Sequence, residues 1–265
     1  MKPKLFTSLI ATAALTGIFS ITAPVSAYEI KSIDTDTTGF KDIIDEFQKL
    51  VQEEGIGINN PSVFKLDPTK LLLAADHDVN IYFLNEGAGF KNQLGFSATN
   101  DSNSQSGLIF ENVSCHSRNS DCQIPSNDGV LNIGDYVELG TFKKGTQFDF
   151  SIIADGFNGG RYVYGADPAS NPDGLEHLVA YEYKGYVVLG FEDLYGPKGN
   201  AQPPNQNSDR DFNDTVFVVD LPVVKEVPEP STTLSLLGIT VVSLVRLGRH
   251  HLSKTDCSRN GYERI

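Results

Sequence analysis

The feature that most constrains the fold is a series of short runs rich in β-branched and aromatic residues. Gly, Asn, Asp and Pro separate these runs, as in Asn171-Pro172-Asp173-Gly174, which is a turn signal. Strands of this length at this spacing favour a mainly β fold, an antiparallel β-sandwich or jelly roll. The expected strands are residues 80–84, 107–113, 136–141, 147–154, 178–183, 186–191 and 215–220.

One segment departs from this pattern. From Phe40 to Val51 the apolar residues recur three and four positions apart, which predicts one N-terminal amphipathic helix. Thr37 or Thr38 is expected to cap its start and Gly55 its end. We therefore expect a helical N-terminal region over 28–74 and an acidic β domain over 75–222.

The first residues have the order of an export signal. Lys2 and Lys4 precede the apolar stretch 5–21, and small residues stand at 25–27. The apolar stretch is shorter than the ~20 residues of a membrane-spanning helix, which favours a signal peptide over 1–27 rather than an uncleaved anchor. Signal peptidase is then expected to cleave after Ala27.

The last forty residues have the features of a second targeting signal. Pro228, Glu229 and Pro230 precede an apolar run, 234–245, which a basic tail follows. Residues 231–247 just reach the lower limit of about 17 residues for a membrane-spanning helix, and the positive tail places its end in the cytoplasm.

This order resembles the PEP-CTERM sorting signal of Gram-negative bacteria and cyanobacteria. We assign residues 227–251 to the sorting signal with its membrane span, and 252–265 to the basic tail. The resemblance implies recognition and cleavage by exosortase, a membrane protease. The protein is then expected to be exported through the inner membrane and anchored there. After C-terminal processing it is expected at the cell surface or outside the cell.

Net charge excludes some partners. Residues 28–226 contain 14 Lys and Arg against 31 Asp and Glu, a net charge of −17. Nucleic acid and anionic lipid would be repelled by such a domain. Exported acidic domains instead meet calcium, for which carboxylates are ligands, although solubility alone also accounts for the charge.

The state of the cysteines depends on the redox conditions of the compartment in which the protein lies. Cys115 and Cys122 flank a short polar loop, and in an oxidising exterior they are expected to form a disulfide. A zinc site through Cys115, His116 and Cys122 is the alternative, but it lacks an evident fourth ligand. Cys257 lies in the basic tail, apart from the other two.

Two acidic clusters stand at the ends of two predicted strands. Glu192 and Asp193 follow one strand, and the run from Asp209 to Asp214 leads into another. If these strands pair, the clusters face each other, and carboxylates that converge need a counter-ion. If the second run is extended, Asp209, Asp211 and Asn213 share one face. Calcium suits such a set because it accepts six to eight oxygens in loose geometry.

Other interpretations remain open. The start at Asp209 resembles an EF-hand loop, but Asp214 stands where the turning glycine belongs. The acids also fit strand ends that keep an edge soluble. A carboxylate pair such as Glu192 with Asp211 would suit a glycosidase, yet the chain has no tryptophan for a sugar platform. His177 is expected to be a structural histidine with its hydrogen bonds satisfied.

A second resemblance rests on motifs that follow one another in order. They begin with Asp76-His77-Asp78-Val79-Asn80 and end with the two acidic clusters, so the likeness covers about 75–221. Together they look like an acidic domain of unknown function found in cyanobacterial PEP-CTERM proteins and some bacterial adhesins. The resemblance implies either metal binding or enzymatic activity. The positions that it carries over are Glu86, Glu192, Asp193, Asp209, Asp211, Asn213 and Asp214.

We therefore expect an exported, calcium-binding cell-surface or extracellular-matrix protein, with these seven residues as the metal ligands and no catalytic residue assigned. Its expected partners are signal peptidase, exosortase, the membrane through the C-terminal span, and a polysaccharide or another component of the cell envelope. A secreted hydrolase directed at glycans through the same acidic cluster is the alternative.

Overall fold

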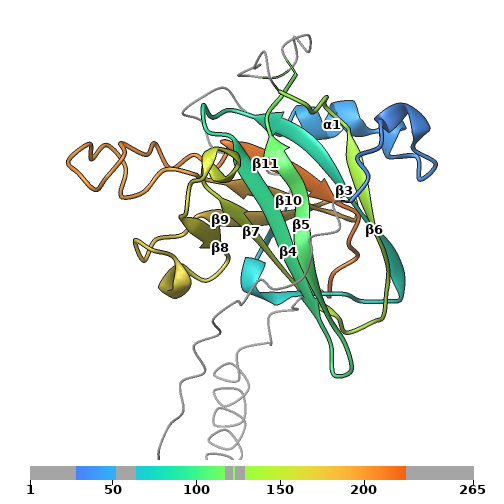
Figure 1. Cartoon of the computed structure of the whole chain (residues 1–265). Helices are drawn as coiled ribbons and strands as arrows, with labels where there is room; N and C mark the ends of the chain where they lie inside the picture. The colour runs from blue at the N-terminus through green and yellow to red at the C-terminus, as the bar shows by residue number, and fades with distance from the viewer. Residues whose placement is uncertain (1–27, 52–63, 117–121, 123–128, 225–265) are drawn as a thin grey trace, which may run out of the picture. The chain divides into compact units, whose positions relative to one another are not determined.

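The computed structural model describes residues 28–51, 64–116, 122 and 129–224 (Figure 1). The chain divides into two compact units, Met1–Val223 and Val224–Ile265, and only Val224 of the second unit is described. The expected signal peptide, sorting signal, basic tail and Cys257 lie outside the described residues. Within the described residues, no helix has the length and apolar character that crossing a membrane requires.

The described residues form two antiparallel sheets, which confirms the expectation of a mainly β fold. The sandwich or jelly-roll assignment goes further and stays a prediction. The first sheet has the order β1 (Phe64–Leu66), β9 (Leu178–Tyr183), β10 (Tyr186–Phe191), β11 (Thr215–Val219), β3 (His77–Glu86) and β6 (Tyr136–Phe142). The second has the order β2 (Leu71–Leu72), β7 (Gln147–Ile153), β4 (Asn92–Thr99) and β5 (Ser104–Val113), with β8 (Val163–Gly165) also paired to β7.

Each of the seven expected strands is present, within a few residues of its expected bounds. β4 was not expected, because Asn92, Gln93 and Gly95 make its first half look like a turn. Its buried and half-buried residues nevertheless alternate along the strand. This alternation is the pattern of a strand with one face in the core.

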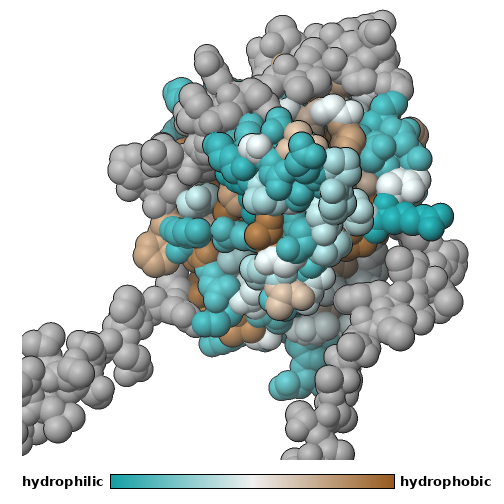
Figure 2. Space-filling view, turned by 90° about the vertical axis from the view of Figure 1, so that its left-hand side faces the viewer, coloured by the Kyte–Doolittle hydropathy of each residue, from teal (hydrophilic) through white to brown (hydrophobic). Residues whose placement is uncertain are grey.

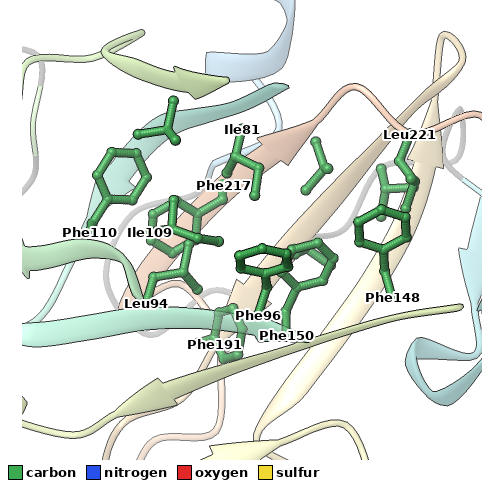
Figure 3. Packing of buried hydrophobic residues seen from close by; sticks show 14 of the residues in the cluster. Ile81, Leu94, Phe96, Ile109, Phe110, Phe148, Phe150, Phe191, Phe217 and Leu221 are labelled. Carbon is green, nitrogen blue, oxygen red and sulfur yellow. The ribbon is translucent and has the colours of Figure 1, made fainter. Parts of the chain in front are cut away.

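The main core lies where the inner faces of the two sheets meet (Figure 3). Phe217 of β11 is central to it, because its ring lies 5.7 Å from that of Phe110 and 6.3 Å from that of Phe191, centroid to centroid. Every residue of β11 is buried. Phe217 belongs to the main core, whereas Val216 and Val218 belong to a second cluster on the other face of the sheet. β11 is therefore covered on both faces.

The N-terminal segment builds that second cluster. Phe40, Phe47 and Leu50 are buried there, and the Phe40 ring stacks on Tyr82 of β3 with a centroid distance of 4.1 Å. The helix is shorter than expected: a 3-10 turn η2 (Phe40–Asp42) is followed by α1 (Ile44–Gln48), because Ile43 between them has a non-helical φ of −120°. Other 3-10 turns are η1 (Ile33–Thr35), η3 (Pro68–Lys70), η4 (Gly156–Asn158) and η5 (Pro168–Ser170).

Pairing of β10 with β11 places the acidic residues. The strands are antiparallel, with Phe191 opposite Thr215. The residues that follow β10 and those that precede β11 are therefore at the same end of the sheet. The connection between them, 192–214, contains no helix or strand.

Candidate metal centre

Three of the expected ligands gather at this end of the sheet. Glu192, Asp209 and Asp211 each present a carboxylate oxygen, and these oxygens lie within 4.8 Å of one another. Two oxygens bound to one calcium ion at 2.3–2.6 Å can be at most about 5 Å apart. The three carboxylates are thus spaced closely enough to share one ion. Glu192 and Asp211 are buried, whereas Asp209 is half-buried.

The carboxylate of Glu192 is the most constrained of the three. The residue has no exposed surface, and its Oε2 atom is buried without a hydrogen-bond partner. Its Oε1 atom accepts a long hydrogen bond, 3.4 Å, from the N–H of Leu194. A buried carboxylate oxygen without a partner is unfavourable by several kcal/mol unless it is protonated or meets a cation.

Burial raises the pKa of Glu192 above its ordinary value, and the charge of Asp209 raises it further. The hydroxyl of Ser208 and the guanidinium of Arg210 act in the opposite direction, but they do not outweigh burial. Without a metal ion, Glu192 therefore resists ionisation.

Asp209 and Asp211 lie in an irregular segment. The extended conformation considered for this segment from the sequence is therefore not adopted. Arg210 and Phe212 have φ values of 59° and 60°, in the left-handed region, and β11 begins only at Thr215. Left-handed residues alternate with the two aspartates. Each such residue other than glycine costs on the order of 1 kcal/mol and persists only where its surroundings hold it.

Arg210 provides a positive charge beside the cluster. Its guanidinium attracts Glu192, donates a hydrogen bond through Nη2 to the backbone carbonyl of Glu176, and lies 5.1 Å from the centroid of the Phe212 ring. Three ionised carboxylates carry a charge of −3, and Arg210 reduces it to −2. A divalent cation would neutralise the remainder.

The other expected ligands take different positions. Glu86, Asp193 and Asp214 are buried in a neighbouring network, in which Asp193 accepts a hydrogen bond of 2.7 Å from the side-chain amide of Asn92. Burial raises the pKa of Asp193 to about 7 and that of Glu86 to about 8. Burial also raises the pKa of Asp214, and the charge of Asp193 adds to the shift. These three acids are not part of the closely spaced oxygen group, although the charge of Glu192 also raises the pKa values of Asp193 and Asp214.

Asn213 supports the cluster through its backbone. Its side chain is fully buried, and its N–H donates to Oδ1 of Asp211 over 3.2 Å. Asp211 is therefore held by the residue that the sequence analysis had taken as a ligand.

A buried histidine holds the segment that contains Glu192. The Nδ1 atom of His177 lies 2.8 Å from the backbone oxygen of Glu192, and Nε2 lies 2.9 Å from Oδ2 of Asp173. Both ring nitrogens are engaged, as expected for a structural histidine. The ring stacks on Tyr164 with a centroid distance of 3.7 Å. Burial lowers the pKa of His177.

Asp173 has a role that was not expected from the sequence. Its Oδ2 also accepts a hydrogen bond of 2.8 Å from the N–H of Gly196, so Asp173 and His177 fix both ends of the segment from Glu192 to Gly196. Burial alone would raise the pKa of Asp173, but the N–H of Gly196 and the ring of His177 lower it. The only signal in the sequence is the spacing of an Asp four residues before a His.

Cys115 and Cys122 form a disulfide, with their Cα atoms 6.4 Å apart. A disulfide leaves neither sulfur as a thiolate, so this structure does not offer the alternative zinc site. The N–H of Cys115 donates to Oε2 of Glu86. The disulfide therefore adjoins the buried network of Glu86 rather than the cluster of Glu192.

One family model matches the part of the chain that contains the candidate centre. Neither a curated protein nor a solved structure matches the chain. Residues 142–222, which include Asp173, His177 and all three residues of the cluster, match the family model described as "Domain of unknown function (DUF4114)".

Proposed function

We propose that the domain binds one calcium ion through Glu192, Asp209 and Asp211. The observation that carries the proposal is the Oε2 atom of Glu192, which is buried, has no hydrogen-bond partner and lies in a group of three carboxylates of suitable spacing. When all three carboxylates are ionised they carry a charge of −3, of which the neighbouring Arg210 offsets one unit. A divalent ion removes both the charge and the missing contact.

The ligand chemistry favours calcium over other divalent ions. All three donors are carboxylate oxygens, whereas zinc sites in proteins are usually built with Cys and His. Magnesium requires nearly ideal octahedral geometry at 2.0–2.1 Å, which an irregular loop supplies less readily than the wider and looser shell of calcium. Backbone carbonyls and water would complete the shell, and the half-buried Asp209 leaves one side of the ion accessible.

The ion would connect two separate parts of the chain. Glu192 directly follows β10, whereas Asp209 and Asp211 belong to the irregular segment before β11. Binding at all three would close the long connection between these strands and stabilise its left-handed residues. The ion would thus act as a structural link that orders this connection in the folded protein.

The proposed setting is outside the cell. The signal peptide over 1–27 and the Pro228-Glu229-Pro230 tail support export, followed by cleavage by signal peptidase and by an exosortase-type protease. This resemblance to PEP-CTERM proteins is the basis for placing the domain at the cell surface or in the extracellular matrix. Millimolar calcium outside the cell would suffice for a site of modest affinity.

The alternative of a glycan-directed hydrolase receives less support. Glu192 has no exposed surface and Asp211 is only 3% exposed, so neither carboxylate reaches a substrate in this structure. A glycosidase needs both carboxylates beside the scissile bond. The geometry favours a structural ion over direct catalysis.

The test is a calcium titration followed by thermal unfolding and calorimetry. In the mature domain, calcium at millimolar concentration should raise the melting temperature, and magnesium at the same concentration should raise it less. The increase should disappear in Glu192→Gln and in Asp211→Asn. Asp101→Asn removes an exposed acid from the turn between β4 and β5 and should leave the increase unchanged. No calcium-dependent increase in the parent protein would reject the proposal.

A further inference from the structure

Two tyrosines, one of them three residues after Glu192, form an aromatic surface that is partly accessible. The rings of Tyr162 and Tyr195 lie 5.2 Å apart, centroid to centroid, with an angle of 36° between their planes. Tyr162 is 41% exposed and stands directly before β8, while Tyr195 is half-buried. Two adjoining rings of this kind offer a wide, rigid surface with polar hydroxyl groups.

Tyr195 pairs through its backbone with Gln206, and each of the two lies three residues from a proposed ligand in the sequence. The N–H of Tyr195 donates to Oε1 of Gln206 over 2.7 Å, and the N–H of Gln206 donates to the carbonyl of Tyr195 over 2.9 Å. Glu192 precedes Tyr195 by three residues, and Asp209 follows Gln206 by three. Because three residues span at most about 11 Å, the backbone of Tyr195 is no farther than that from Glu192. The same limit holds between Gln206 and Asp209.

The loop that starts at Tyr195 is polar. Five amide residues lie between the tyrosine and Ser208, and no aliphatic residue larger than alanine or proline occurs among them. Figure 2, which shows the side of the molecule that carries this loop, is largely hydrophilic with separate apolar spots. The side-chain amides at the loop surface can both donate and accept hydrogen bonds. They are Asn200, Gln202, Asn205, Gln206 and Asn207.

The proposed ion would be reachable from solvent beside Asp209. Asp209 is the one half-buried ligand of the three, so the coordination positions next to it open toward solvent. Calcium keeps water in such positions and exchanges it for other neutral oxygens. Two neighbouring hydroxyls of a sugar ring are oxygens of this kind, at a spacing that permits both to bind one ion.

We propose that this surface binds a neutral carbohydrate chain in a calcium-dependent manner. One sugar ring would stack its C–H face on Tyr162 and Tyr195, its neighbouring hydroxyls would bind the calcium ion, and the loop amides would bind the adjoining sugar. The proposal rests on the proposed calcium site. Anionic polymers suit the surface less well because the domain carries a net charge of −17 over residues 28–226.

The test measures oligosaccharide binding by calorimetry in calcium and in EGTA. The probes are hexasaccharides of α-linked glucose, β-linked glucose, mannose and galactose. The variants are Tyr162→Ala, which removes the exposed ring, and Tyr162→Phe, which keeps it. Phe64→Ala is the matched control, because Phe64 is 50% exposed and pairs with Glu182 of β9, whereas the site adjoins the Leu178 end of that strand. Thermal unfolding of each variant with and without calcium verifies that the fold and the ion site are intact.

The expected result is binding of at least one hexasaccharide in calcium and none in EGTA. Tyr162→Ala should weaken that binding at least tenfold, whereas Tyr162→Phe and Phe64→Ala should change it less than threefold. If calcium raises the melting temperature but no hexasaccharide binds at millimolar concentration, the carbohydrate site is rejected and the calcium site stands. Equal loss in Tyr162→Ala and Phe64→Ala also rejects it. Absence of any response to calcium rejects both.

Discussion

The N–H of Asp193 donates a hydrogen bond of 2.7 Å to Oδ2 of Asp214, which joins the residue after β10 to the residue before β11. This bond extends the pairing of the two strands beyond their ends. The side chain of Asp193 accepts a hydrogen bond from the side-chain amide of Asn92. Adjacent acids in the sequence thus belong to different clusters.

Replacing Glu192 should have opposite effects with and without calcium. In EGTA, Glu192→Gln should leave stability unchanged or raise it by about 1 kcal/mol, because it removes a buried carboxylate whose ionisation is unfavourable. In millimolar calcium the parent protein should be the more stable of the two. Urea unfolding under both conditions measures the difference, and a variant that is destabilised equally in both would contradict the proposed role.

The pH dependence of stability should reflect Glu86. Its pKa in the folded protein is raised to about 8, above that of an exposed glutamate, so the folded state holds a proton that the unfolded state has released. Stability should therefore be highest below about pH 4 from this group alone, and should fall as the pH rises through about 8.

The matched variant for this prediction is Glu86→Gln, which keeps an acceptor for the N–H of Cys115 but cannot ionise. The decline in unfolding free energy between pH 5 and pH 9 should be smaller in this variant, by an amount on the order of 1 kcal/mol or more. Measurements in EGTA keep calcium from contributing. A decline identical to that of the parent protein would show that Glu86 is not the group responsible.

Asp173 should control calcium affinity without touching the ion. Asp173→Asn weakens the hydrogen bonds to Gly196 and His177, which position the segment of Glu192. We expect about a tenfold loss of calcium affinity and a loss of about 1–3 kcal/mol in stability. Glu176→Gln is the control, because the side chain of Glu176 is 42% exposed and forms a surface ion pair with Lys65 at 3.8 Å. Calorimetric titration of both variants should show the contrast.

Removal of the disulfide should destabilise the domain modestly. Cys115 and Cys122 are seven residues apart, and for a loop of this length the chain-entropy model gives about 2–3 kcal/mol. The Cys115→Ser, Cys122→Ser double variant should lose about that much in urea unfolding. Calcium affinity should be unchanged, because the disulfide adjoins Glu86 rather than Glu192. A large loss of affinity would instead connect the two clusters.

The two processing signals predict the mass of the protein recovered from its cells. Cleavage after Ala27 gives a chain that starts at Tyr28, and cleavage near Pro228-Glu229-Pro230 removes the basic tail. Intact-mass measurement checks both ends together. A protein that retains residues 1–27 or 252–265 would contradict the corresponding signal.

The strand pattern was predictable because it depends on local composition. β9, β10 and β11 are runs of β-branched and aromatic residues that end in turns, so their bounds were close to those expected. The helix was harder: Phe40, Phe47 and Leu50 face the sheet as their spacing predicts, but Ile43 interrupts the helix with a backbone conformation that no spacing reveals.

The candidate site was predictable only in part, for a similar reason. Pairing of the two acidic strand ends followed from the order of the strands, and it brings Glu192 to Asp209 and Asp211. The left-handed backbone conformation of Arg210 and Phe212 sets the course of the chain around Asp209 and Asp211. The side chains of Arg210 and Phe212 do not indicate that conformation in the sequence. The hydrogen bond from Gly196 to Asp173 and the ring contact between Tyr162 and Tyr195 join segments distant in the sequence, so they emerge only in three dimensions.

Burial of β11 on both faces limits how far an event at the acidic loop can spread. A strand held between two packed layers has no room to shift when its neighbour changes shape. Occupancy of the loop by an ion should therefore slow amide exchange between residues 194 and 214 while leaving the rates in β10 and β11 as they were. The response of the domain to calcium would then be confined to the connection between β10 and β11, while the strands themselves stay in place.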